Sequence, residues 1–408
     1  METRPPSSRK GGLQRKLGLG LLTAYGVGVM VGAGIYVLVG VVIGLAGVWA
    51  PLAFLLAGLV ALPSALSYAE LATRLPEAAA EVAFIERGFD SRALALVAGL
   101  AGVTAGVISG AAVLRGGVGY LSALVPLPEP LLILSLGVFL TLVALKGVLE
   151  SLILAALFTA IEIAGLLAVT AAGFMAEPVA EWQAFAGGQG MGPEWAGLAA
   201  ATSLCFFAFI GFEDIENMAE EVRNPSRVLP RAILMALAIT AALYTLVAFA
   251  AVRAVPHEQI AATERPLALV WEIGTGTGAG FLSAIAVAAA VNGVLAQIVM
   301  AARVLFGLGR RAGWLAVFAT AHARRGTPTG ATLLVGAGVI LAALALPVVA
   351  LAEVTSAVLL AVFFLVNLAL ILIKRKSPEA PFRVPVLVPW AGLIAALAAL
   401  AATSGGLG

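Results

Sequence analysis

The sequence predicts an all-α protein that crosses a lipid bilayer many times. Of its 408 residues, 62% are hydrophobic and only 11% are charged, and its mean hydropathy is +1.07. Water-soluble domains carry about 25% charged residues. The apolar residues form long segments, and the basic residues gather in alternate connections between them, as in membrane proteins with several spans. The single cysteine, Cys205, excludes a disulfide framework.

The long apolar segments predict how many times the chain crosses the membrane. A helix needs about 20 mainly apolar residues to cross the hydrocarbon core, and eleven segments meet this criterion. The predicted spans are 17–43, 48–72, 92–124, 131–149, 151–176, 196–219, 229–252, 267–302, 330–350, 352–373 and 388–404. The longest segments are expected to tilt or to continue past the membrane.

The positions of the basic residues predict the orientation. With the N-terminus placed inside, every Lys and Arg falls on the inner side except Arg115, Arg253 and Arg265. Basic residues favour the cytoplasmic side of a membrane. The sequence therefore predicts a cytosolic tail at 1–16, a C-terminus outside, and a multi-pass protein of the cell membrane.

The first predicted span contains an unusual concentration of glycine. The stretch "GVGVMVGAG" carries Gly26, Gly28, Gly32 and Gly34, and each glycine inside a helix costs roughly 1 kcal/mol relative to alanine. Two interpretations are open. The glycines could permit close packing of helices, or the helix could be interrupted there.

The sixth predicted span has the features of a second interruption. In "FFAFIGFEDIENMAEE", Gly211 lies mid-span and is followed by Glu213, Asp214 and Glu216. Ionisable residues at such depth face a cavity, a partner or water. Two interrupted helices five spans apart indicate a transporter built from inverted repeats, with its site where the interruptions meet.

This pattern predicts the domain organisation and the kind of substrate. The first repeat is expected at 17–176 and the second at 196–373, followed by a cytosolic loop and the last span at 374–408. An interrupted helix exposes N–H groups, which attract a carboxylate, and C=O groups, which attract an ammonium group or another cation. A zwitterionic amino acid satisfies both.

Five sequence blocks, in order, resemble the amino acid–polyamine–organocation (APC) family of transporters. They are "GVGVMVGAGIY", "SYAELATRLPEAAAEVAFIERGF", "FFAFIGFEDIENMAEEVRNPSRVLPRAI", "ARVLFGLGRRAGW" and "PFRVP". The resemblance covers residues 17 to about 390. It implies a LeuT-type fold, with a 5+5 inverted repeat, interrupted helices one and six, and alternating access around a site at mid-membrane.

The resemblance also implies the substrate-binding residues. The substrate carboxylate would meet the backbone of Val31, Gly32, Ala33 and Gly34, and the amino group would meet carbonyls around Phe206, Phe207 and Phe209. Phe207 takes the position of an aromatic gate. Gly211 and Glu213 complete the predicted substrate site.

The chain departs from the family in its fifth span. Many relatives carry a lysine there whose ammonium stands in for a sodium ion, but this position is Glu162. A carboxylate in an apolar span could bind a proton, a sodium ion or an arginine. Asn292 in span eight could contribute to the same ion site or could form a hydrogen bond between helices. The sequence predicts ion coupling at Glu162 and Asn292.

The carboxylates after Gly211 leave three interpretations open. Glu213, Asp214 and Glu216 could recognise a basic substrate, could take part in proton coupling, or could line an aqueous cytosolic vestibule. Some relatives that exchange cationic amino acids and amines also have a glutamate at the position of Glu213.

Taken together, these features predict a secondary active amino acid transporter that works by alternating access, coupled to protons or exchanging substrates. The alternative is a cationic amine or polyamine exchanger. An intramembrane enzyme is a remote third possibility, because the two histidines, His257 and His322, lie in connections on opposite sides. The expected partners are an amino acid or amine and the bilayer, without nucleic acid. We expect no catalytic residue, metal or cofactor beyond a coupled H⁺ or Na⁺, and the oligomeric state stays open.

Overall fold

The computed structural model describes residues 17–76, 80–146, 152–188, 192–321 and 327–405. The predicted tail at 1–16 lies outside these ranges. Within them the regular structure is helical, apart from one isolated bridge between Leu17 and Val222. Seven helices of the described chain are long and apolar enough to cross a membrane, and four shorter apolar helices accompany them. The prediction of an all-α polytopic membrane protein is therefore confirmed.

Eleven helices follow the predicted spans. They are α1 (Leu19–Ala46), α2 (Ala50–Arg74), α4 (Arg92–Leu121), α5 (Glu129–Lys146), α6 (Leu152–Met175), α8 (Trp195–Phe207), α9 (Pro225–Ala254), α12 (Gly280–Arg311), α13 (Thr329–Ala345), α14 (Val348–Lys376) and α15 (Leu387–Gly405). Local sequence features determine where several of these helices begin. The Ser91 hydroxyl accepts a hydrogen bond from the Leu94 amide at the start of α4, and prolines occupy the first turns of α2 and α9.

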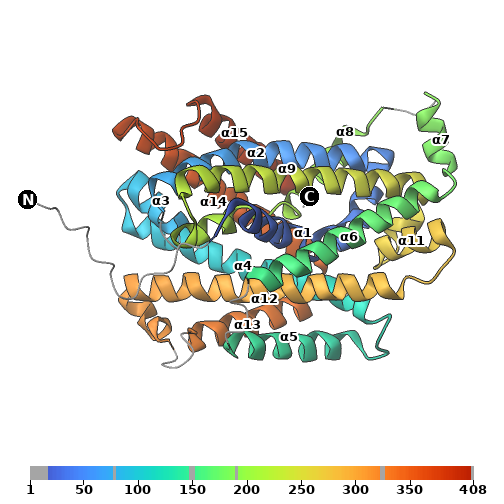
Figure 1. Ribbon diagram of the computed structural model, residues 1–408, viewed down its shortest axis with the longest axis horizontal. Coiled ribbons are helices and arrows are strands. Elements are labelled where there is room, and N and C mark those ends of the chain that lie inside the picture. Colours follow the sequence, from blue (N-terminus) through green and yellow to red (C-terminus); the bar gives the residue numbers. More distant parts are fainter. Residues whose placement is uncertain (1–16, 77–79, 147–151, 189–191, 322–326, 406–408) are drawn as a thin grey trace, which may run out of the picture.

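Shorter elements connect the long helices. They are η1 (Gly47–Trp49), α3 (Ala80–Phe89), α7 (Ala180–Ala186), η3 (Glu213–Glu221), α10 (His257–Ala261), α11 (Pro266–Thr275) and η4 (Gly313–Ala319), where η denotes a 3₁₀-helix. The helix α3 and the 3₁₀-helix η4 lie at one end of the bundle, and α7 and α11 lie at the other end (Figure 1).

The long helices lie side by side along the longest axis of the molecule, with α1 near the centre (Figure 1). α1 packs against α6, α8, α9 and α12. α4 packs most extensively against α12 and also contacts α13 and α14. This arrangement places the glycine-rich segment of α1 inside the bundle, where neighbouring helices surround it.

A buried ionic network closes the end of the bundle that carries α3, which we call the basic end. The Glu70 side chain is fully buried. Its carboxylate accepts hydrogen bonds from Arg74 and from the Lys374 ammonium, which lies 2.6 Å from Oε2, and from the Val384 amide at 2.8 Å. Arg74 also donates to the Ser377 carbonyl at 2.8 Å. The network ties α2, α14 and the connection before α15 together.

One predicted span is wrong in its first part. The sequence predicts a single span at 267–302, but the structure has two helices there, α11 and α12. α11 ends at Thr275 and is followed by Gly276, which has a left-handed backbone (φ +68°, ψ +13°). Glycine adopts this conformation without a steric penalty and commonly terminates helices. The apolar run therefore belongs to a connecting helix and to a span that begins only at Gly280.

Candidate functional site

α1 is interrupted in the middle of its glycine-rich segment. Gly32 has non-helical backbone angles (φ −18°, ψ −166°), and helix continues on both sides. Val31 and Gly34 are buried there, while the side chain of Ala33 lies outside the described part of the structure. An interruption leaves N–H and C=O groups without partners in the helix, and within a membrane such groups need a cavity or a ligand.

The other glycines of α1 allow close packing. Gly26 and Gly28 remain helical. A Cβ atom on Gly26 would clash with the Ile215 side chain, and one on Gly28 would clash with the Thr159 hydroxyl. Both interpretations of the glycine-rich segment therefore apply, each to different glycines: packing to Gly26 and Gly28, interruption to Gly32.

The second interruption follows α8. The helix ends at Phe207, and the amides of Phe209 and Ile210 donate to the carbonyls of Phe206 and Phe207 at 3.0 and 3.2 Å. Gly211 then adopts φ +122°, a conformation that side chains with a Cβ rarely adopt. The chain continues into η3, which is a 3₁₀-helix and not a continuation of α8.

The two interruptions touch. A Cβ on Gly34 would lie 3.5 Å from Ala208 Cα, and one on Gly211 would lie 3.3 Å from the Met30 amide nitrogen. The buried Tyr244 hydroxyl of α9 lies 2.6 Å from the Met30 carbonyl and 3.1 Å from the Ala208 carbonyl. A third helix thus holds the backbone of both interrupted segments in place.

The segments are joined a second time at the basic end. The Leu17 amide donates to the Glu221 carbonyl at 3.0 Å, and the Arg223 amide donates to the Leu17 carbonyl at 2.9 Å. This bridge connects the start of α1 to the end of η3. The half of α1 before Gly32 and the segment after Gly211 are therefore linked at both ends.

The three phenylalanines predicted at the site have different surroundings. The Phe207 ring lies beside Gly34, 3.9 Å from a Cβ built on that glycine. The Phe206 ring instead packs against Phe363 with centroids 5.7 Å apart, and Phe209 packs against Tyr244 at 5.4 Å. The Phe207 ring thus lies beside the interrupted segment of α1, whereas the other two rings pack against α14 and α9.

Glu162 lies within the span formed by α6 and is 1% exposed. Neither of its carboxylate oxygens has a hydrogen-bond partner within normal geometry. The neighbouring polar side chain is that of Asn292 on α12. The Tyr36 hydroxyl of α1 donates to the Glu162 backbone carbonyl at 3.2 Å, and the Tyr36 carbonyl accepts from Tyr120 at 2.7 Å. The two predicted ion-coupling residues thus lie together between α1, α6 and α12.

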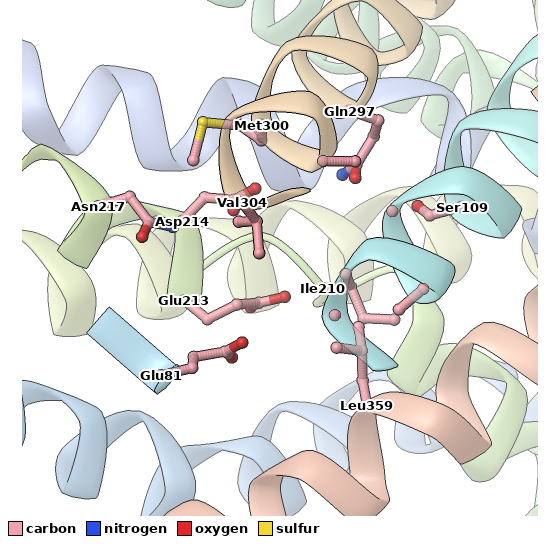
Figure 2. A pocket seen from close by; sticks show the side chains of 14 residues that line it. Glu81, Ser109, Ile210, Glu213, Asp214, Asn217, Gln297, Met300, Val304 and Leu359 are labelled. Atoms are coloured by element: carbon pink, nitrogen blue, oxygen red, sulfur yellow. The ribbon is translucent and has the colours of Figure 1, made fainter. Parts of the chain in front are cut away.

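Carboxylates line a cavity of about 60 Å³ on the basic-end side of the second interruption, which we call the acidic cavity. Figure 2 shows the Glu81 and Glu213 side chains approaching each other, with Asp214 nearby and Gln297 and Ser109 farther along the wall. The lining comes from α3, α4, α12, α14 and the segment around Gly211.

Two contacts fix the carboxylates of the acidic cavity. Tyr68 donates to Glu81 at 2.6 Å, and the Gly211 amide donates to Glu213 at 2.9 Å. Burial raises the pKa of Glu81, and the Tyr68 hydrogen bond opposes that rise. Within the described ranges, no group of three or more His, Cys, Asp or Glu side chains is arranged to hold a metal ion.

The sequence interpretation missed two residues of this region. Tyr244 belongs to none of the five family-like blocks, and its role depends on a contact with carbonyls more than 30 residues away in the chain. Glu81 lies within one of the five family-like blocks, but α3 was expected in a cytosolic connection. Its proximity to Glu213 arises only because α3 turns back against the bundle.

Comparisons with known proteins are consistent with this geometry. The profile of the family described as "Amino acid permease" matches residues 17–406. The mouse (Mus musculus) "Cationic amino acid transporter 4" is 30% identical over 362 residues, which cover 83% of this chain and 56% of that protein. The Bacillus subtilis "Branched-chain amino acid permease BcaP" is 30% identical over 201 residues, 49% of this chain and 42% of that protein.

A third relative is named for a different substrate. The "Methylthioribose transporter" of Bacillus subtilis is 31% identical over 203 residues, 49% of this chain and 43% of that protein. The chain spans about half the length of these relatives. Because the family profile matches nearly all of it, in a membrane fold with two interrupted helices in contact, the chain belongs to the amino acid permease family.

Proposed function

We propose that this protein is a secondary active transporter that carries amino acids across the membrane by alternating access. The observation that carries the proposal is the contact between the two interruptions, at Gly32 and around Gly211. The backbone groups released there suit the carboxylate and the ammonium of an amino acid. Phe207, which faces Gly34, would cover the bound molecule.

The distribution of basic residues supports an orientation. Arg74, Arg92, Arg311 and Lys374 lie at the ends of α2, α4, α12 and α14 that form the basic end. By the positive-inside rule this end faces the cytosol. On this proposal the acidic cavity opens toward the cytosolic half of the pathway, and the protein resides in the cell membrane.

Uptake into liposomes tests the proposed function. Purified full-length protein would be reconstituted, and uptake of labelled amino acids, amines and a polyamine would be followed with protein-free liposomes as the reference. We expect saturable uptake of at least one amino acid and faster uptake when unlabelled substrate is loaded inside, if exchange occurs. Uptake of an amine without any amino acid would contradict the proposal.

We infer that Glu162 couples transport to protons. Its carboxylate is removed from water, has the Asn292 amide as its neighbouring polar side chain and lies where α1, α6 and α12 meet. The titratable groups on the neighbouring elements that interact electrostatically with it include the phenols of Tyr36 on α1 and Tyr244 on α9. A buried carboxylate without a basic partner favours binding a cation, and the proton is the smallest one available.

The variant Glu162→Gln tests this coupling. It keeps the shape of the side chain but cannot bind and release a proton. Wild-type uptake should rise as the external pH falls below neutrality, whereas uptake by the variant should be independent of pH and reduced by about tenfold, within the usual range of coupling energies. The control is Glu258→Gln, at an exposed glutamate of α10.

Two results would contradict the assignment. If Glu162→Gln retains the wild-type pH profile, Glu162 is not the coupling site. If wild-type uptake depends on external sodium and not on pH, the coupled ion is sodium. The Glu258→Gln control must behave as the wild type in both measurements.

A further inference from the structure

Glu216 is a buried carboxyl group that has no part in the transport site described above. Its side chain is 0% exposed, and neither of its oxygens has a hydrogen-bond partner in the described part of the chain. It is not among the residues that line the acidic cavity. A buried carboxylate is strongly destabilising unless a cation or hydrogen bonds compensate its charge. In this conformation the side chain is therefore stable only when a cation neutralises it.

The groups around Glu216 do not supply that positive charge. Those that interact with it electrostatically include the carboxylates of Glu81 on α3 and of Glu213 and Asp214 on η3, and the phenol of Tyr68 on α2. All of these groups are acidic, and like charges disfavour the ionised form. The proton is then the cation that best fits a closed site without other ligands.

The remaining elements that pack against η3 are α1 and α9. α1 brings Tyr25, whose phenol interacts with Glu221 and with Arg303 of α12. The basic residues at the start of α9, Arg227 and Arg231, are exposed. Within the described ranges, no basic side chain is among the groups that act on Glu216.

η3 is joined to the first half of α1, so the two segments form one unit. The Ile215 side chain lies against Gly26, where a Cβ atom would clash with it. Leu17 exchanges backbone hydrogen bonds with Glu221 and Arg223 at the end of η3. A displacement of η3 away from α2 and α9 would therefore carry the first half of α1 with it.

We infer that Glu216 is a proton-binding site whose occupancy keeps η3 docked against α2 and α9. With its proton the side chain is neutral and stays buried. When the carboxyl O–H bond breaks and the proton passes to water, the charge that remains is stable only in contact with water. η3 and the first half of α1 then separate from the bundle and open the cytosolic half of the pathway. This inference rests on the proposed alternating access.

The direction of the pH effect follows from this linkage. The docked state holds a proton on Glu216 that the open state releases, so a rise in pH favours the open state. For one proton, the ratio of open to docked protein changes by up to about tenfold per pH unit. Low pH should therefore keep the cytosolic side closed.

A buried thiol on α1 reports this opening without any transport. In a Cys205→Ala background, Thr23→Cys places a single thiol in the first half of α1. The Thr23 side chain is 6% exposed, and its hydroxyl has no hydrogen-bond partner among the described residues, so the exchange removes no hydrogen bond. The thiol in the purified full-length protein would react with a water-soluble maleimide between pH 6 and pH 8.

Each rate is divided by the rate of the same thiol in the denatured protein, which removes the titration of the thiol itself. We expect this relative rate to rise about tenfold or more over the range with Glu216 present, and to change by less than about threefold in Glu216→Gln. The amide keeps the shape of the neutral acid and cannot ionise.

Two variants serve as matched controls. Glu221→Gln removes a half-buried carboxylate from the same 3₁₀-helix, and Glu216→Asp keeps a carboxyl group at the same position. Both should retain the rise of the rate with pH. Size-exclusion chromatography identifies a variant that fails to fold, and if Glu216→Gln fails, Glu216→Met carries the test with an apolar side chain of similar length.

Three outcomes would overturn the inference. A relative rate that does not change with pH in the presence of Glu216 would separate its protonation from opening. An equal rise in Glu216→Gln would assign the effect to another group. A rate that falls on addition of sodium at constant pH, only with Glu216 present, would assign the site to sodium. Absence of amino acid uptake by the wild type in liposomes would instead contradict the proposed function itself.

Discussion

Replacement of Gly211 by valine is expected to abolish uptake. Gly211 has φ +122°, and a branched side chain in such a backbone conformation costs about 1–3 kcal/mol. The added Cβ would also lie 2.7 Å from Val29 Cγ1 and 3.3 Å from the Met30 nitrogen, and overpacking of this kind costs about 1–3 kcal/mol more. Because about 3 kcal/mol changes an equilibrium by roughly a hundredfold, the contact between the two interruptions should be lost.

A second glycine separates backbone strain from crowding. Gly276 also has a positive φ, +68°, but a Cβ there would meet nothing within 4 Å. Gly276→Val should therefore lower the melting temperature in detergent slightly and retain uptake, and Gly211→Ala should give an intermediate loss. Wild-type uptake by Gly211→Val would show that transport does not require this contact.

The sequence predicts that α1 is interrupted within its glycine-rich segment, but it does not predict at which glycine. Gly26, Gly28 and Gly32 are chemically identical, and their roles differ because of their neighbours. Ile215 and Thr159 press against the first two, which stay helical, while Gly32 lies beside Gly293 of α12 and leaves helical geometry. These neighbours are distant in the sequence, so local propensity cannot distinguish the three positions.

The start of the eighth span could not be predicted from hydropathy, for a different reason. The glycine-rich segment "GTGTGAG" at 274–280 is typical of a helix end. In the structure, Gly276 follows the last residue of α11 and has the left-handed conformation that terminates the helix. Averaging hydropathy over a span-length window hides such a short signal, because the flanking residues are strongly apolar. The turn residues at 274–280 therefore predict the boundary between α11 and α12 better than the length of the apolar run does.

The two interruptions of the backbone are the part of the candidate site that the sequence predicts most directly. The interruptions at Gly32 and after Phe207 follow from glycine content and from the carboxylates of the sixth span. The side-chain environment could not be predicted in the same way. Glu81 reaches Glu213 only through the packing of α3, and Phe206 and Phe209 face other helices although they neighbour Phe207 in the sequence.

The second large effect is expected at the basic end. In Glu70→Gln, the Arg74 and Lys374 side chains would stay buried, at 7% and 8% exposure, beside a neutral group. Breaking a buried ion pair by removing one partner destabilises a protein by about 3–5 kcal/mol. We expect a marked fall in the melting temperature of the detergent-solubilised protein, larger than that of any other single carboxylate variant considered above.

The exposed ion pair between Glu86 and Arg311 provides the matched control. Its atoms lie 2.5 Å apart, but the side chains are 42% and 33% exposed, and such pairs contribute about 0–1 kcal/mol. Glu86→Gln should therefore melt close to the wild type. The comparison isolates burial, since both variants remove one carboxylate charge from the same end of the bundle.

A double variant distinguishes an unpaired charge from a lost tether. Glu70→Gln combined with Lys374→Met removes the buried ammonium as well, and should recover much of the stability because Arg74 still donates to the Ser377 and Glu379 carbonyls. If the double variant is no more stable than Glu70→Gln, the unpaired ammonium is not the cause of the loss. The bond from the Val384 amide to Glu70 would then be the contact that matters, and the connection between α14 and α15 would depend on it.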